Sequence, residues 1–265
     1  MLILLPPSET KSRPAADAAP LDLARLALPE LEDARRTMVR AAIRTAAGRD
    51  AATRLGVPAS APELVDRMAS LEHEPAASPL AVYSGVLYDQ LPPDTAVPTD
   101  RRVLVQSALL GVVDAATDRI PAYRLSAGSS VSRLGTAASW WAPRLRGVGA
   151  ALLAEQATSP APLVIDGRSG SYRSMMRLKS TPEVPVLEVA PVQERAGVRK
   201  VISHDAKRYR GIVTRELLSA DRAPEDPREL VSLLQERLAA VPGVAGSPLT
   251  VELDGHRLVI VDRVA

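Results

Sequence analysis

Two stretches of the chain place hydroxyl, carboxylate and cationic side chains within a few residues of one another. The first, SETK, covers residues 8–11 and follows an apolar run at 2–5 and two prolines. The second, DAKRYR, covers residues 205–210 and contains three cations and one acid. Ammonium, guanidinium and hydroxyl groups at this spacing suit the binding of a phosphate, and Glu9 could act as a base beside them.

The cations of the second stretch fall on a predicted helix at 204–218. Lys207 and Arg210 are three positions apart and share one face of it, whereas Arg208 lies about 100° round the helix. Upstream, residues 166–179 (DGRSGSYRSMMRLK) place four cations around Gly/Ser turns, whose backbone N–H groups suit phosphate oxygens. For both stretches the alternative is a solvated helix face and an ordinary surface loop.

The elements that must position these residues alternate irregularly between strands and helices. The run at 2–5 predicts a strand buried on both faces, which the two prolines end because proline donates no ladder hydrogen bond. A hairpin is predicted at 249–262, with the Asp-Gly pair at 254–255 as its tight turn. The other predicted elements are strands at 103–106, 163–166, 184–192 and 198–203, helices at 21–48, 62–71, 136–157 and 227–240, and loops at 13–20 and 74–79.

This pattern predicts a mixed α/β (α+β) fold, with a mixed central sheet and surrounding helices. No internal repeat and no repeated βαβ unit is visible, so residues 1–265 are expected to form a single compact domain.

Composition narrows the classes of function. Cysteine is absent, which excludes disulfides, thiolate metal sites and thiol redox switches. The net charge of +2 is unevenly spread, since residues 101–215 carry eighteen Lys/Arg against eight Asp/Glu and both flanking segments are acidic. This bias indicates a polyanionic partner, with a solvated basic surface as the alternative. Without a signal peptide or an apolar run of ~20 residues, a cytoplasmic protein with no membrane partner is expected.

Known catalytic and metal-binding motifs are missing. The sequence has no Gly-rich phosphate loop of Walker or dinucleotide type, no Gly-x-Ser-x-Gly elbow and no paired histidines at helical spacing. The histidines at 73, 204 and 256 are isolated, and His204 followed by Asp205 fits a helix cap better than a metal ligand. The sequence therefore predicts no metal, no cofactor and no catalytic set, which favours a non-enzymatic role.

Five blocks extend over nearly the whole chain: LILLPPSET at 2–10, VYSGVLYDQL at 82–91, GVVDAATDRIPAYRL at 111–125, LVIDGRSGSY at 163–172 and VISHDAKRYRGIVTREL at 201–217. In order and spacing they resemble the YaaA-type peroxide stress proteins, of the kind found in actinobacteria. The positions that match the motifs of this family are 6–11, Tyr83, Gly85, Tyr88, Tyr123, Arg124, Leu125 and the Ala-Lys-Arg-x-Arg-Gly residues of 206–211. Where the family commonly has Leu-Arg-Pro, this chain has Val-Asp-Ala at 113–115, so a basic contact there is lost.

The resemblance implies a cytosolic protein of unusual single-domain α/β fold that binds DNA through a positively charged cleft and limits oxidative DNA damage, with a link to free iron. It also implies a helix-hairpin-helix element, for which the candidates are 145–155 and 241–246. The residues expected to contact DNA or another anion are Lys11, Arg124, Arg168, Ser169, Arg173, Lys179, Lys207, Arg208 and Arg210. Those expected to line the cleft are Ser8, Glu9, Thr10, Tyr83, Gly85, Tyr88, Tyr123 and Tyr172.

Two classes of function follow. A sequence-independent DNA-binding protein, acting on duplex or branched DNA, would have an affinity that falls steeply with salt. An enzyme acting on a small phosphorylated or nucleotide ligand would enclose it among tyrosine, arginine and lysine side chains, with Glu9 or Asp166 as base. An interaction module without a ligand is a third class. The sequence favours DNA binding by a monomer, and no carboxylate-rich cluster indicates a direct iron site.

Overall fold

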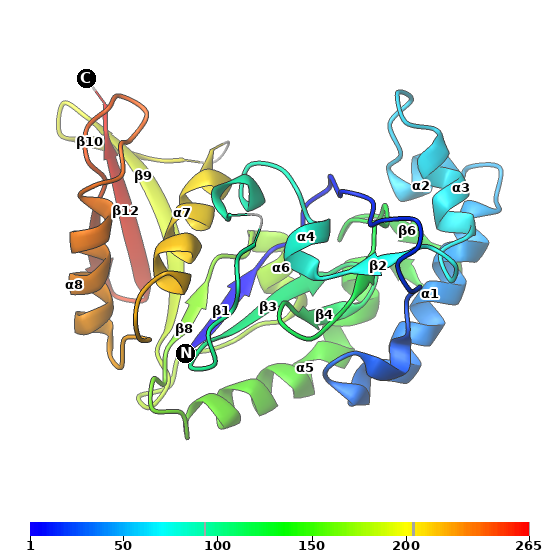
Figure 1. The fold of residues 1–265 in the computed structure, drawn as a ribbon, viewed down its shortest axis with the longest axis horizontal. Helices are drawn as coiled ribbons and strands as arrows, with labels where there is room; N and C mark the ends of the chain where they lie inside the picture. Colours follow the sequence, from blue (N-terminus) through cyan, green and yellow to red (C-terminus); the bar gives the residue numbers. More distant parts are fainter. Residues whose placement is uncertain (93, 203–204, 265) are drawn as a thin grey trace.

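A computed structural model describes residues 1–92, 94–202 and 205–264. Within these ranges the chain forms one eight-stranded sheet in the order β11-β12-β9-β8-β1-β3-β4, with β10 also paired to β9 (Figure 1). Its strands are β1 (Leu2–Leu5), β3 (Arg102–Ser107), β4 (Gly111–Asp114), β8 (Val164–Asp166), β9 (Val186–Arg195), β10 (Val198–Val201), β11 (Thr250–Asp254) and β12 (Arg257–Arg263). Two short ribbons pair β2 (Ala76–Ala77) with β5 (Ile120–Pro121) and β6 (Ser130–Val131) with β7 (Gly135–Thr136).

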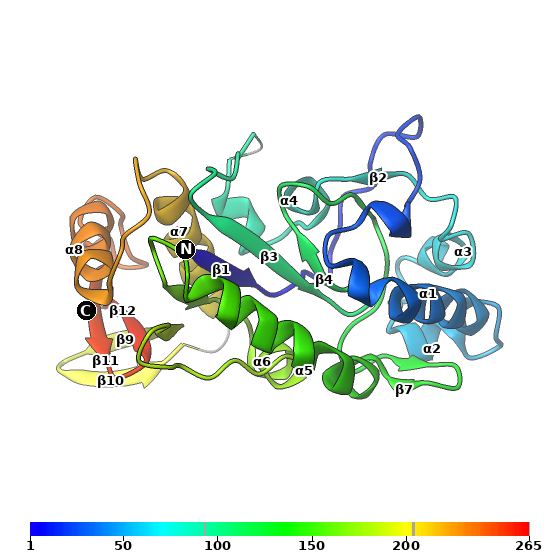
Figure 2. The same cartoon turned by 90° about the horizontal axis from the view of Figure 1, so that it is seen from below.

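Helices cover both faces of the sheet. The long helix α5 (Ala137–Gln156) and α6 (Gly170–Met175) lie on one face, and α7 (Ala206–Leu218) lies on the other (Figure 2). The remaining helical elements are α1 (Glu32–Ala46), α2 (Ala51–Leu55), α3 (Glu63–Ala69), α4 (Pro79–Val82) and α8 (Pro227–Leu238), with 3-10 turns η1 (Leu23–Arg25), η2 (Pro29–Leu31) and η3 (Tyr88–Gln90). The predicted mixed α/β fold, with a central mixed sheet in one compact domain, is confirmed.

β1 occupies the middle of this sheet. It pairs in parallel with β3 on one side and with β8 on the other, and all four of its residues are buried, as the apolar run predicts. Each such aliphatic side chain contributes about 1.5–3 kcal/mol when it is fully buried. Because β1, β3 and β8 point the same way, the segments that follow them meet at one edge of the sheet.

The helix predicted over 21–48 is shorter than expected. It begins only at Glu32, since Leu28 adopts a left-handed φ of 60° and Pro29 follows it. A residue before proline is disfavoured in the helical conformation, so the chain makes two 3-10 turns first.

Two C-terminal predictions need correction. The strand predicted at 198–203 is shorter, since β10 ends at Val201, and its four residues are exposed. Positions 203 and 204 lie outside the described residues. The terminal hairpin is confirmed, but Asp254 pairs with Arg257, which makes Gly255–His256 the turn, one residue later than predicted. Gly255 supplies the positive φ, 56°, at the first turn position.

Neither candidate for a helix-hairpin-helix forms one. Residues 145–155 lie inside the continuous helix α5, so no hairpin interrupts them. Residues 241–246 connect α8 to the strand β11, not to a second helix. Gly243 is needed there for packing, because a Cβ atom would meet the buried carboxylate of Asp262.

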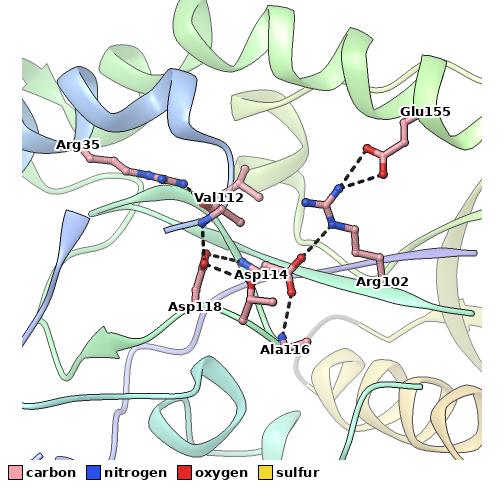
Figure 3. Close-up of polar contacts among 9 residues, drawn as sticks. Arg35, Arg102, Val112, Asp114, Ala116, Asp118 and Glu155 are labelled. Atoms are coloured by element: carbon pink, nitrogen blue, oxygen red, sulfur yellow. Dashed lines mark hydrogen bonds and ion pairs between the residues drawn. The ribbon is translucent and has the colours of Figure 1, made fainter. Parts of the chain in front are cut away.

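The amino-terminal edge of the parallel strands is closed by paired charges. Arg102 at the start of β3 donates to the Asp114 carboxylate at 2.9 Å and pairs with Glu155 of α5 (Figure 3). Asp114 also accepts the Ala116 N–H at 2.9 Å. Beside them the buried guanidinium of Arg101 donates to backbone carbonyls of the α7 end. The cations at this edge therefore serve the fold.

Candidate anion-binding site

The opposite edge of the sheet gathers the predicted site residues. Residues 6–11 follow β1, Ser107 ends β3, and residues 167–170 follow β8. In open α/β sheets a ligand binds outside the carboxyl ends of the strands, where neighbouring connections diverge. Here β1 has β3 on one side and the later strand β8 on the other, so this edge is such a point.

The SETK segment is held against residues 82–85, which begin the second of the five sequence blocks. Backbone N–H groups of each segment donate to carbonyls of the other, and the hydroxyls of Ser8 and Thr10 lie 3.2 Å apart. Gly85 has φ +94°, and a Cβ atom there would lie 3.0 Å from Thr10 Oγ1. Glycine at this position therefore allows the close approach of the two segments.

Three tyrosines form the buried floor beneath this segment. Tyr83 and Tyr88 stack with ring centroids 5.3 Å apart, and Tyr83 meets Tyr123 edge to face. The Tyr83 and Tyr123 hydroxyls share a hydrogen bond of 2.9 Å, and Tyr123 shares a second, of 2.8 Å, with Ser107. Tyr88 donates to the Pro6 carbonyl at 2.7 Å. Burial raises the pKa of all three phenols, which therefore stay protonated at neutral pH.

Lys11 lies above this floor. Its half-buried ammonium donates to the Ser8 carbonyl at 2.6 Å and lies 4.1 Å from the centroid of the Tyr123 ring. Burial, followed by the like charge of Arg124, lowers the pKa of Lys11 from 10.5 to about 7. Lys11 can therefore hold or release a proton near neutral pH, and it favours an anion that would restore its charge.

Glu9 ties two distant segments to the site. Its carboxylate accepts from Lys207 of α7 at 2.9 Å, and its carbonyl accepts from Arg124 at 3.0 Å. The pKa of Glu9 is lowered overall. Burial alone would raise this pKa, but the hydrogen bond and the positive charge of Lys207 outweigh burial, so the carboxylate remains ionised. A second donor atom of Arg124 is held by the Gly56 carbonyl. The structure thus brings together Glu9, Lys11, Arg124 and Lys207.

Helix α7 reaches this edge because it packs closely on η3. A Cβ atom at Gly211 would lie 2.2 Å from the Leu87 carbonyl oxygen, so only glycine fits there. Lys207 points to the site, whereas Arg208 donates to the Pro242 carbonyl and lies near the C-terminal loop. This separation agrees with the predicted helix geometry and removes Arg208 from the group of site residues.

Arg210 and Arg173 form a second cationic pair beside the first. Burial, and then the charge of Arg173, lowers the pKa of Arg210, whose Nε is buried without a hydrogen-bond partner in the described part of the chain. Arg173 is ion-paired with Glu188 of β9. Arg210 lies against Gly167, in the segment after β8. Two carboxylates act on Arg210, namely Glu188, which is paired with Arg173, and Asp166, which is paired with Arg168. Both are already used by other guanidiniums, so positive charge is in excess at this edge.

Arg168 does not belong to the surface, contrary to the expectation that it contacts DNA. Its side chain is 1% exposed and donates to both Asp166 carboxylate oxygens, at 2.9 and 2.7 Å. A further guanidinium nitrogen donates to Gln106 and to the Met176 carbonyl. This ion pair is a structural link between β8, β3 and α6, and it also occupies the carboxylate that was considered as a base.

The remaining predicted residues are divided between the site and its surroundings. Ser169 begins α6 and its hydroxyl lies 3.3 Å from that of Ser171, while Tyr172 is buried and burial raises its pKa. Lys179 is exposed in the loop after α6, whose Leu178 packs on α5, so Lys179 lies apart from Lys11. His73 and His256 are also exposed.

Some site residues were not predicted. Ser107 and Gln106 of β3 contact Tyr123 and Arg168, and Glu188 of β9 contacts Arg173. The sequence hint for the two β3 residues was that they are polar and directly follow the apolar run at 103–105. No group of three or more carboxylates or histidines placed to hold a metal ion occurs in residues 1–92, 94–202 and 205–264.

Comparison with known proteins places this geometry in a family. The family described as "Peroxide stress protein YaaA" matches residues 1–240. The chain belongs to this family. A UPF0246 protein of Corynebacterium efficiens is 34% identical over 259 residues, which cover 97% of each chain. A UPF0246 protein of Streptomyces coelicolor is 35% identical over 269 residues, which cover 97% of this chain and all of its own.

These relatives confirm the resemblance and its actinobacterial character, and membership of the YaaA family supports a role in peroxide stress. The block that departs from the family pattern has a structural use, because Asp114 pairs with Arg102 at the other edge of the sheet. Among the described residues no helix is long and apolar enough to cross a membrane.

Proposed function

We propose that this YaaA-family protein acts in peroxide stress by binding DNA, independently of base sequence, through the anion-binding site. The observation that carries the proposal is the excess of cations at the carboxyl edge of the sheet, where Lys11 lies near Arg124 and Arg173 lies near Arg210. Neighbouring like charges are costly in the free protein and become favourable when a polyanion lies over them.

The distribution of the charges supports a backbone contact rather than base reading. Lys207 and Glu9 are 41% and 53% exposed, so their ion pair can exchange for a phosphate at little cost. Arg124 donates to two backbone carbonyls and is held in position. Lysine and arginine side chains of this kind neutralise phosphates and release counterions.

A small phosphorylated ligand is the second candidate for the same site. The observation that favours it is the enclosed position of Lys11, which lies over two tyrosine rings and carries a lowered pKa. Groups whose pKa is strongly shifted gather at catalytic sites. A single small anion would bind in a saturable way with a mild salt dependence, unlike DNA.

Fluorescence anisotropy with labelled duplex and branched DNA over a salt series tests the proposal. We expect the logarithm of affinity to fall with the logarithm of salt by several units, at about 0.9 per neutralised phosphate. The variant Lys207→Ala/Arg210→Ala should lower both affinity and slope. Its matched control is Arg44→Ala/Arg146→Ala, which removes two exposed arginines from α1 and α5.

Equal losses in both double variants would contradict a DNA contact at this edge. Absence of DNA binding at low salt would refute the proposal. Saturable binding of a phosphorylated compound, abolished by Lys11→Met, would establish the second candidate.

A further inference from the structure

A second basic feature lies away from the anion-binding site, next to helix α1. A cavity of about 710 Å³ opens between residues 19–26, one face of α1, and the turn at 117–119. Ligand-binding pockets typically have volumes of ~300–1,000 Å³. Its walls come from segments far apart in the sequence, so the cavity is enclosed by several elements and is not a groove along one helix.

Four arginines line this cavity: Arg25, Arg36, Arg40 and Arg119. Arg36 and Arg40 are four residues apart and share one face of α1. Arg36 is ion-paired with Glu32. Throughout residues 1–92, 94–202 and 205–264, the other three guanidiniums have no carboxylate or carbonyl partner. These three guanidiniums line one cavity and are free to donate hydrogen bonds to an anion.

Two carboxylates of the described residues, Asp22 and Glu72, line the same cavity. Asp22 is used in the fold, because its side chain accepts the Ala24 N–H at 3.1 Å and caps η1. Glu72 is exposed and forms no ion pair with a guanidinium of the described residues, so it is available as a hydrogen-bond acceptor. Leucine side chains at 21 and 23, together with buried Val39, provide apolar surface between these polar groups.

A buried arginine fixes the position of the helix that carries Arg36 and Arg40. Arg35 of α1 is fully buried and donates to the carbonyls of Leu28 and Leu110. It also donates to the Val112 carbonyl (Figure 3). Burial lowers its pKa to about 10, so it remains charged at neutral pH. Its nearby carboxylate, Asp118, is itself engaged with backbone N–H groups.

Asp118 also fixes the walls of the cavity. Its two oxygens accept the Ala27 N–H at 2.7 Å and the Asp114 N–H at 2.8 Å, which joins the segment after η1 to the end of β4 (Figure 3). Arg25 and Arg119 stand on the two segments that this carboxylate joins. The arginines therefore project from a framework that is set before any ligand arrives, which reduces the entropy lost on binding.

We infer that this cavity binds a small phosphorylated metabolite of the nucleotide type, with its phosphate held by Arg25, Arg40 and Arg119. Guanidinium forks match phosphate oxygens in pairs, which makes arginine the preferred partner of a phosphate. Glu72 is placed to accept hydrogen bonds from sugar hydroxyls, and the leucines at 21 and 23 offer an apolar surface for a base. The site is separate from the DNA-binding edge and does not depend on the proposed function.

Isothermal titration calorimetry with AMP tests this inference, with ribose 5-phosphate, inorganic phosphate and adenosine as comparison ligands. AMP should bind saturably at one site, and adenosine, which lacks the phosphate, should bind at least ~10-fold more weakly. Arg40→Ala and Arg119→Ala should each weaken AMP binding by about 10-fold or more, since hydrogen bonds to charged groups contribute about 1.5–3 kcal/mol. Arg44→Ala, an exposed arginine of α1 that does not line the cavity, is the matched control.

Both substituted arginines are exposed, so the variants should fold, and circular dichroism checks this. The inference is overturned if AMP does not bind, if Arg44→Ala weakens it as much as Arg40→Ala, or if Lys207→Ala/Arg210→Ala abolishes it. Equal affinity for inorganic phosphate and AMP would also overturn the nucleotide assignment. We expect Arg40→Ala to lose AMP binding and to keep DNA binding, which would show that the two sites are separate.

Discussion

The two edges of the parallel strands use their charges in different ways. At the amino-terminal edge, Arg102 bridges Asp114 and Glu155 (Figure 3). The buried Arg101 is held there by backbone carbonyls. At the carboxyl edge, the ion pairs Lys207–Glu9 and Arg173–Glu188 lie beside neighbouring like charges. The pKa values of Lys11 and Arg210 are lowered by burial and by those like charges.

The difference separates stability from binding. Paired charges at the first edge are satisfied in the free protein, so they gain nothing from an anion. Unbalanced cations at the second edge have a free-energy cost that a bound anion removes. The Arg168–Asp166 pair shows that proximity to the second edge is not enough, because this arginine is enclosed and fully used by the fold.

The largest loss of stability is expected for Arg168→Ala. It leaves the buried Asp166 carboxylate without its guanidinium partner, and breaking a buried pair costs about 3–5 kcal/mol. Urea denaturation followed by circular dichroism should record this loss in the free energy of unfolding. A loss below 1 kcal/mol would place Arg168 outside the core and return it to the surface group.

A smaller loss of stability is expected for a substitution at the amino-terminal edge. Arg102→Ala removes one partner of the mostly buried Asp114, which keeps the Ala116 N–H, and should cost about 1–3 kcal/mol of stability. DNA affinity, measured by anisotropy, should stay within twofold of wild type. A tenfold loss of affinity in a folded variant would mean that both edges bind DNA.

Lys207→Ala should change DNA binding and leave stability nearly unchanged. Its exposed ion pair with Glu9 contributes only about 0–1 kcal/mol to stability. The salt slope of DNA binding should nevertheless fall by about 1, the amount expected for one lost phosphate contact. Arg44→Ala serves as the single-charge control, and an unchanged slope in Lys207→Ala would remove α7 from the interface.

A pH dependence is expected from Lys11, which faces Glu9, Arg124, Tyr83 and Tyr123. Its pKa is about 7 in the folded protein and ordinarily 10.5, so the unfolded state binds more protons between these values. The stability contribution of Lys11 therefore rises with pH across this window, whereas its attraction for DNA falls as pH passes 7. Lys11→Met should lose both trends, and parallel pH profiles of wild type and variant would contradict the lowered pKa.

Local pattern was enough to predict the fold class and most elements. The buried strand at 2–5 and the helices later described as α5, α7 and α8 follow from apolar runs and helical spacing. The helix at 21–48 failed at Leu28 and Pro29, where one left-handed residue stops helix propagation. Strand β4 was not predicted at all, because its four buried residues in GVVD carry no alternation.

The sequence named residues from several blocks, and only part of them meet in the structure. The helical spacing predicted that Lys207 and Arg208 point different ways, and Lys207 donates to Glu9 whereas Arg208 donates to the Pro242 carbonyl. The burial of Arg168 was not predictable, because its partners Gln106 and Met176 come from segments that meet only in the folded sheet. Charge counted along the chain has the same limit, since the basic central segment is divided between both edges and α5.

Hydrogen–deuterium exchange with and without duplex DNA compares the two edges in the unmodified protein. The account predicts slower exchange on DNA binding in residues 8–12, 83–90, 169–174 and 205–211, and no change in 98–103 or 114–119. Protection confined to 98–103 and 114–119, or no protection at a DNA concentration that saturates anisotropy, would contradict the claim that the carboxyl edge binds DNA.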